Sequence, residues 1–340
     1  MRIMLAPMEG VIDHHFRALY SEVGGIDLCV SEFIRVNDLP VGRNVLQRDC
    51  PELKQNYRTT KSGKPNRAGH TEADMPVRVQ LLGSNPETLA ETAQNAANLD
   101  APGIDLNFGC PAKTVNNSMG GAILLRDSER IHQIVAAVRK AVKPAVPVTA
   151  KIRLGYERRE NYVENALAIA EAGASELCVH ARSRADKYDP PAYWECIAEI
   201  RQAVSIPVIA NGEIWSVADW QRCRQESQCN DFMLGRGLIA CPDLALQIKR
   251  EASSEACAQT TSDRLQWVDV VELLNRFYEE TRDSYPPRFL GNRVKQWLFY
   301  LKLQYPEALE FFERIKRFKL AEDFETAFLN ERMLYSRNET

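Results

Sequence analysis

Short apolar segments that end in glycine, proline or a polar residue recur along the first three quarters of the chain. Eight of them have the length and composition of β-strands. They lie at residues 2–7, 27–33, 77–83, 103–109, 146–154, 176–182, 206–212 and 231–237. Six amphipathic stretches with helical spacing follow strands, at residues 14–24, 87–99, 128–142, 161–173, 192–204 and 216–227. Strands that alternate with helices favour parallel pairing, and eight such units predict an α/β fold, a closed (β/α)8 TIM barrel.

A doubly wound open sheet is the competing architecture, but its GxGxxG fingerprint after the first strand is absent. The pattern changes after residue 250. Residues 251–263 read EASSEACAQTTSD, a small and polar stretch that predicts a linker. Helical spacing then returns at residues 267–282, 293–306, 308–318 and 323–334. We therefore predict a barrel over residues 1–250, a linker over 251–263 and a small C-terminal all-helical domain over 264–340.

Composition narrows the class of protein. The 340 residues are 45% hydrophobic, which is ordinary for a folded soluble protein. The nine cysteines form no CxxC pair, so the sequence indicates neither a disulfide framework nor a zinc site. There is no apolar run of membrane-spanning length and no signal peptide. These features predict a cytoplasmic protein without a metal, and a monomer is the default expectation.

Charge is unevenly distributed although the net charge is only −3. Residues 35–67 and residues 286–320 each carry eight basic and three acidic side chains. One such segment alone is equally consistent with a solvated face. Two of them, with excess acid elsewhere, favour a polyanionic partner. Residues 34–76 are also long for one loop, and loops of that length are usually functional.

In a TIM barrel the active site lies at the C-terminal ends of the strands, so residues scattered in sequence form one ring there. Lys151 alternates with Val148 and Ala150, which places its charge on the opposite face, where it needs a partner. We expect it to stabilise negative charge on a bound ring, with the amides of Gln80 and Asn211 suited to the edge of a heterocycle. The glycines after the last two strands indicate a phosphate site, to which Arg236 adds a guanidinium.

The stretch GIDLNFGCPAKT, residues 103–114, places Cys110 between a glycine and a proline where a strand ends. A cysteine is most often a small buried hydrophobe, but this turn predicts an exposed thiol. Cys178 and His180 share a strand face, yet two ligands do not make a metal site. A satisfied histidine or a cofactor contact is the better interpretation of His180.

Seven motifs together resemble the tRNA-dihydrouridine synthases, flavin enzymes that reduce uridines in tRNA. They are APMEGV (6–11), GIDLNFGCPAKTV (103–115), GGAILL (120–125), AKIRLG (150–155), VHAR (179–182), IANGEI (209–214) and MLGRG (233–237). The C-terminal motifs GNRVKQWLFYL (291–301) and FFERIKRF (311–318) are similar to those of the C subfamily, which acts on uridine 16 of the D-loop. One departure is the segment 48–76, which is longer than that subfamily leads us to expect.

The resemblance implies a bound FMN, NADPH as reductant, and tRNA held against the C-terminal helical domain. Its FMN contacts would fall on Pro7, Met8, Glu9, Gln80, Lys151, His180, Asn211, Gly212, Glu213, Gly235 and Arg236. Its tRNA contacts would fall on Arg35, Asn107, Arg293, Lys295 and Lys316. Cys110 matches the catalytic cysteine, which protonates C5 of the uracil ring while C6 receives a hydride. A thiol with its ordinary pKa of about 8.5 is mostly protonated at neutral pH and suits this role.

Three other functions are weighed against this one. The chain could modify a different uridine of tRNA, or it could be a flavin barrel that reduces a free pyrimidine. A small substrate needs neither two basic segments nor an added helical domain. An inert RNA-binding barrel is the third alternative, but it would not need Cys110 and Lys151 at strand ends.

Overall fold

The structure is a computed structural model that describes residues 1–55, 57, 67–254 and 264–336. Contacts divide the chain into two units. The first comprises Met1–Gly10, Ile26–Ile214 and Ala218–Gly235, and the second comprises Val11–Gly25, Trp215–Val217 and Arg236–Thr340. Part of the predicted linker (255–263) and the basic residues Arg58, Lys61 and Lys64 lie outside the described residues.

The first unit is built on parallel strands. They are β1 (Ile3–Leu5), β2 (Leu28–Val30), β3 (Ile34–Arg35), β4 (Val77–Leu82), β5 (Ile104–Phe108), β6 (Val148–Arg153), β7 (Glu176–His180), β8 (Val208–Asn211) and β9 (Asp231–Leu234). Strand β1 pairs with both β2 and β9, and β2 also pairs with β4, which closes a ring of eight strands. The short β3 is an addition at the end of β4. The predicted eight-stranded barrel is therefore confirmed.

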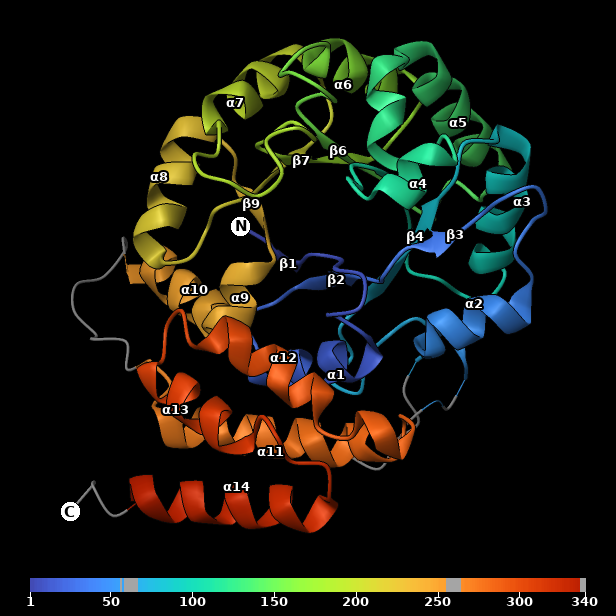
Figure 1. The fold of residues 1–340 in the computed structure, drawn as a ribbon. Coiled ribbons are helices and arrows are strands. Elements are labelled where there is room, and N and C mark those ends of the chain that lie inside the picture. Colours follow the sequence, from blue (N-terminus) through green and yellow to red (C-terminus); the bar gives the residue numbers. More distant parts are fainter. Residues whose placement is uncertain (56, 58–66, 255–263, 337–340) are drawn as a thin grey trace. The chain divides into compact units, whose positions relative to one another are not determined.

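The helices of this unit follow the strands. They are α2 (Arg43–Asp49), α3 (Pro86–Ala97), α4 (Lys113–Asn117), α5 (Ser128–Ala141), α6 (Tyr162–Glu171), α7 (Trp194–Ala203) and α8 (Val217–Ser227), with 3-10 turns η1 (Pro51–Leu53) and η2 (Gly121–Arg126). Helices α3 and α5 to α8 surround the strands (Figure 1) and confirm five predicted helices. The short helices α2 and α4 were not predicted.

The barrel interior changes from apolar to polar along the strands. Met4, Cys178 and Met233 belong to one buried cluster inside the ring. Residues in register on neighbouring strands point to the same face of a sheet. Lys151 is in register with both Cys178 and Asn107, and Asn211 is in register with Met233. These three polar side chains therefore face the interior, as the alternation around Lys151 predicts.

The second unit is helical. Its elements are α1 (His14–Val23), α9 (Arg236–Ala240), α10 (Leu244–Ser254), α11 (Trp267–Arg282), η3 (Pro287–Phe289), α12 (Asn292–Leu301), α13 (Pro306–Ile315) and α14 (Ala321–Ser336). Three aromatic rings pack together in it, with centroid distances of 4.9–5.4 Å between Phe16, Phe277 and Trp297. Helices α11 to α14 confirm the predicted C-terminal helices. Helix α10 continues through residues 251–254, the first residues of the predicted linker, and the predicted domain bounds stay a prediction.

The second unit includes residues 11–25, and its last segment begins at Arg236. The sequence predicts a domain boundary at residue 250 instead. Among the described residues, no helix is long and apolar enough to cross a membrane. Within the same ranges, no group of three or more His, Cys, Asp or Glu side chains could hold a metal ion.

Candidate active site

A chain of buried amide and carboxyl groups crosses strands β4, β5 and β6 inside the barrel. Gln80 donates from Nε2 to Oδ2 of Asp105 at 2.7 Å, and its Oε1 accepts from Nδ2 of Asn107 at 2.8 Å. The other oxygen of Asp105 accepts from the Thr149 hydroxyl at 2.6 Å. Burial raises the pKa of Asp105 above its ordinary value, against the opposing effect of these two hydrogen bonds. The predicted site residues Gln80 and Asn107 are thus brought together.

Asn107 also shapes the turn that carries Cys110. Its Oδ1 accepts from the backbone N–H groups of Gly109 and Cys110, at 3.0 and 2.9 Å. On the other side, Arg153 donates from Nε to the Gly109 carbonyl at 3.0 Å. Side-chain caps of this kind hold a turn in one conformation. The thiol therefore leaves strand β5 in a direction set by Asn107 and Arg153.

Cys110 differs in burial from the other cysteines. Of the eight in the described part of the chain, seven are buried and Cys110 is partly exposed. This agrees with the prediction of an accessible thiol at the turn. Burial of part of the side chain raises the pKa of Cys110, and the nearby charge of Glu9 acts in the same direction. A hydrogen bond from the Ala112 backbone lowers it by more than Glu9 raises it, and the charges of Arg35 and Arg153 lower it by less. The thiol is thus held protonated at neutral pH.

Lys151 is a cation of the barrel interior, near the strand ends. Its Nζ donates to Oδ1 of Asn211 at 2.9 Å, and Nδ2 of Asn211 donates to the Met233 carbonyl at 2.8 Å. Burial lowers the pKa of Lys151 below its ordinary value. An ammonium group has three N–H donors, and among the described residues only Asn211 accepts from it. A partly buried donor set left incomplete in this way fits an electron-rich ring bound above it.

The backbone after β8 packs closely against the end of β7. Gly212 has φ of +113°, and a Cβ there would lie 2.6 Å from Cδ2 of His180, so only glycine fits. Trp194 donates from Nε1 to the Gly212 carbonyl at 2.9 Å. Glu213, which has a positive φ, forms an ion pair with the fully buried Arg182. His180, at the end of β7, therefore lies against the turn that contains Gly212 and Glu213. All three are predicted site residues.

The ends of β1 and β9 also meet. A Cβ built on Gly235 would lie 3.5 Å from Sδ of Met8, an ordinary contact. Pro7 and Met8 are partly buried, whereas Glu9 is exposed and pairs with Arg35 at 3.4 Å. Glu9 and Arg35 both act on the Cys110 pKa, so they lie on the Cys110 side of the barrel. Most of the ring predicted from strand ends is thereby assembled within the first unit.

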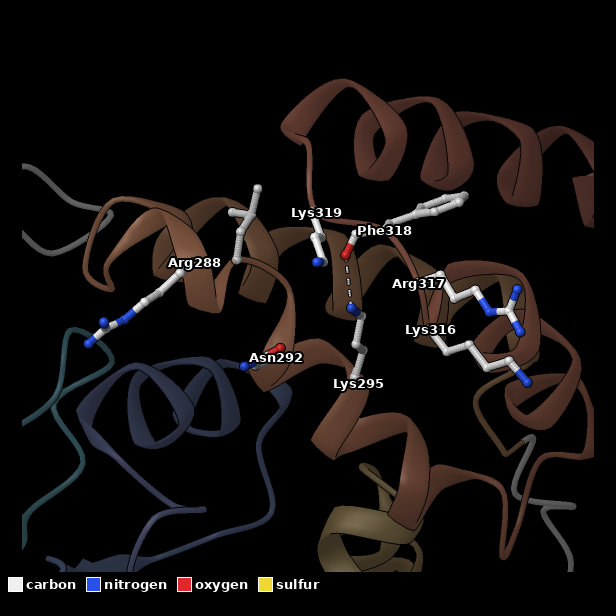
Figure 2. A pocket seen from close by; sticks show the side chains of 8 residues that line it. Arg288, Asn292, Lys295, Lys316, Arg317, Phe318 and Lys319 are labelled. Carbon is white, nitrogen blue, oxygen red and sulfur yellow. Dashed lines mark hydrogen bonds between the residues drawn. The ribbon is translucent and has the colours of Figure 1, made fainter.

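The second unit contains a cationic cavity of about 590 Å³. It is lined by Arg288, Leu290, Asn292, Lys295, Lys316, Arg317, Phe318 and Lys319, so five of its eight side chains are cationic and none is acidic (Figure 2). Lys295 donates to the Phe318 carbonyl at 3.0 Å, and burial together with the charge of Lys319 lowers the pKa of Lys295. Lys316 forms an ion pair with Glu313. The predicted contacts Lys295 and Lys316 thus line one cavity.

Two further predicted residues have structural partners in the second unit. Arg293 donates to the Val11 carbonyl at 2.7 Å and to Oδ2 of Asp13 at 2.9 Å, and its side chain is only 14% exposed. Although burial raises the pKa of Asp13, the Arg293 charge helps to hold that pKa below its ordinary value. The Arg236 guanidinium lies 5.0 Å from the ring centroid of Trp215. Neither side chain lines the cationic cavity, and their ligand contacts stay predictions.

Sequence reasoning missed Asp105 and Thr149, which complete the buried polar chain. Asp105 lies two residues before Asn107 on the same strand face, so the period-2 pattern of GIDLNFG contained a signal for it. Thr149 carried no such signal because a threonine in a strand is ordinary. Its role becomes visible only from the register of β5 with β6.

Residues 4–332 match the family model described as Dihydrouridine synthase (Dus). A Pseudomonas putida protein named tRNA-dihydrouridine(16) synthase is 47% identical over 319 residues, which cover 93% of each chain. Proteins with the same name from Shewanella oneidensis and Haemophilus influenzae are 45% and 42% identical, covering 95% and 98% of this chain and 96% and 100% of their own. The solved old yellow enzyme homologue of Zymomonas mobilis is 13% identical, with a TM-score of 0.49, over 78% of this chain and 91% of its own. That last likeness adds nothing to the assignment, which rests on the sequence relatives.

Proposed function

The chain belongs to the dihydrouridine synthase family, and we propose that it reduces the C5–C6 double bond of uridine 16 in tRNA to give 5,6-dihydrouridine. The observation that carries this proposal is the partly exposed Cys110 thiol, whose turn is fixed by Asn107 inside the polar end of the barrel. The same end holds the partly buried cation Lys151. A proton donor and a cation at one strand end suit the reduction of a polarised double bond.

A flavin fits the residues at this end of the barrel. The incomplete donor set of Lys151 suits an electron-rich ring, and the glycines after β8 and β9 suit the approach of a phosphate or ribityl oxygen to the backbone. We extend the proposal to FMN as the flavin and NADPH as its reductant. A bound flavin supplies the hydride that C6 of the uracil ring receives. Pro7, Met8, Gln80, His180 and Gly235 are proposed to complete its surroundings.

The protein's own residues are proposed to supply the proton that C5 of the uracil ring receives. Once C6 has gained a hydride, C5 carries the excess electron density and must be protonated. The Cys110 thiol is proposed to donate this proton as a general acid. Its partial burial and the Glu9 charge, which raise its pKa, keep the proton on sulfur until that moment. A thiolate nucleophile would need the opposite shift.

Recognition of tRNA is proposed to use cationic side chains in both units. A base inside a folded tRNA cannot enter a barrel, so the target uridine must be turned out, at a cost of a few kcal/mol. The five cations of the cavity in Figure 2 suit phosphate groups of the RNA backbone. Arg35 and Asn107 are proposed to contact RNA in the first unit. The enzyme is further proposed to act in the cytoplasm as a monomer.

The test combines two measurements. The purified protein is examined for flavin by its visible absorbance and by the mass of the released cofactor, and dihydrouridine is mapped by position in tRNA from cells that lack the gene. We expect a yellow protein that releases FMN, and loss of dihydrouridine at position 16 alone. Loss of dihydrouridine at another position would show that the enzyme acts on that uridine and not on uridine 16. If every position stays modified, the proposed function is wrong.

The raised pKa of Cys110 predicts the pH dependence of proton transfer. The active form is the protonated thiol, so the rate falls as pH rises through the thiol pKa. Because that pKa is raised, this fall should lie above about pH 8.5, the ordinary value for a thiol. The measurement is single-turnover reduction of tRNA by pre-reduced enzyme over a range of pH. A fall centred well below the ordinary thiol pKa would contradict a protonated donor.

A further inference from the structure

The hydrogen-bonded chain beneath Cys110 ends on a carboxylate that no part of the proposed chemistry uses. Asp105 is 3% exposed, and each of its oxygens accepts a hydrogen bond, one from Gln80 and one from Thr149. A buried carboxyl group is costly unless it is fully hydrogen-bonded. The hydrogen bonds to both oxygens of Asp105 therefore offset the cost of its burial. Its partners lead step by step toward the catalytic turn.

The direction of every hydrogen bond in this chain is fixed from both ends. Both oxygens of Asp105 accept hydrogen bonds, so Gln80 turns its NH2 group toward Asp105 and its carbonyl oxygen toward Asn107. Asn107 must then present its own NH2 group to Gln80. At the far end, two backbone N–H groups of the turn require the Asn107 oxygen. Both requirements give the same orientation of both amides.

We propose that Asp105 is a positioning residue that holds the Cys110 turn in its reactive geometry through Gln80 and Asn107. This inference rests on the proposed function and extends it to a residue that does not touch the substrate. Loss of the acceptors at position 105 frees Gln80 to rotate, and Asn107 then loses the partner of its NH2 group. The turn then keeps Arg153 on the Gly109 carbonyl, and Asn116 and Ala122 on the Cys110 carbonyl, but loses the side-chain cap on its N–H groups. Small losses of alignment at a reacting group cost large factors in rate.

Two substitutions separate this role from general burial. Asp105→Leu keeps the approximate volume and removes both acceptors. Asp105→Asn keeps one acceptor for Gln80, while its NH2 group can donate to Thr149, whose hydroxyl has the Ile104 carbonyl as an alternative acceptor at 3.4 Å. We therefore expect asparagine to rescue what leucine loses. If the leucine variant does not fold, Asp105→Ser takes its place, because the serine hydroxyl is too short to reach Gln80.

The matched control is Glu176→Met. Glu176 is a second buried carboxylate of the barrel interior, and it accepts from Arg2 and Arg78 at 2.6 Å each. It begins strand β7, at the end of the barrel opposite the Cys110 turn. Loss of Glu176 should lower thermal stability without changing the turn. If the substitutions only loosened the barrel, Cys110 would become equally exposed in Asp105→Leu and in Glu176→Met.

Two readouts are measured on the holoenzyme. One is single-turnover reduction of tRNA, and the other is the rate at which iodoacetamide alkylates Cys110, followed on its own peptide by mass spectrometry. In Asp105→Leu we expect turnover to slow at least about tenfold. Cys110 alkylation should rise at least about threefold, because a loosened turn exposes the thiol. Asp105→Asn and Glu176→Met should both alkylate at the wild-type rate.

Wild-type alkylation and turnover in the leucine variant would overturn the proposal, as would an asparagine variant as impaired as leucine. If Glu176→Met accelerates Cys110 alkylation as much as Asp105→Leu does, the acceleration comes from lost stability alone. That result would also overturn the proposal. The alkylation comparison does not need the enzyme to act on tRNA. If wild-type protein fails to reduce tRNA, the proposed function fails, while alkylation still decides the role of Asp105.

Discussion

Replacement of Cys110 by alanine is expected to slow single-turnover reduction of tRNA by about 10²- to 10⁴-fold, the usual contribution of a general acid. Flavin content and tRNA affinity should stay near wild type, because the thiol lies on a turn held by Asn107 and Arg153 and not by its own side chain. The rate is measured by rapid mixing of pre-reduced enzyme with tRNA. Re-oxidation of the flavin and formation of dihydrouridine are followed together.

The matched control for this variant is Cys196→Ala, which removes a buried thiol from helix α7. It should reduce tRNA at close to the wild-type rate. A Cys110→Ala enzyme with normal single-turnover reduction would eliminate the proton-donor role and would direct attention to another acid at the strand ends. Loss of flavin in the same variant would instead indicate a structural role for the thiol.

Charge reversal in the cationic cavity should produce the second large effect. The double variant Lys316→Glu with Lys319→Glu is expected to weaken tRNA binding at least about tenfold at moderate salt. Both side chains are exposed and line the cavity, so substitution should leave the helical core intact. If each lysine neutralises one phosphate, the slope of log affinity against log salt should fall by about 1.5–2. The measurement is a titration of tRNA binding at several salt concentrations.

The control for this variant reverses two exposed lysines of the barrel unit, Lys140→Glu and Lys143→Glu, at the C-terminal end of α5 and just beyond it. It changes the net charge by the same amount, so it reports the effect of overall charge alone. We expect a smaller loss of affinity and an unchanged salt slope. Equal losses in both double variants would show that the cavity is not a specific RNA contact.

The strands could be predicted from sequence because each is a short apolar run with a clear stop. Strand β3 was missed because Ile34–Arg35 is too short to show a period. Helices α2 and α4, of seven and five residues, lack a complete apolar stripe for the same reason. Helix α10 was not predicted, and its last residues are small and polar, which resembles a linker.

The sequence predicts which residues form the candidate site better than it predicts which residues bond to one another. Alternation along a strand indicates which side chains share the interior face, and Lys151 and Asn107 follow from it. The hydrogen bond from Lys151 to Asn211 joins β6 to β8 across an intervening strand, and sequence spacing carries no information about such a contact. Arg293 was grouped with the RNA contacts by charge alone. Its ion pair with Asp13, 280 positions earlier, could come only from the three-dimensional structure.

The pairing of β1 with β9 has a consequence for how the protein is made. Ile3, Met4 and Leu5 are in register with Phe232, Met233 and Leu234, and Arg2 bonds to Asp231 across 229 positions. The ring therefore cannot close on the ribosome until residue 234 has left the exit tunnel. Until then the nascent chain exposes the unpaired edges of β1 and β8, which are templates for pairing with other chains. Translation of this protein thus includes a long interval in which those edges are open to pairing with other chains.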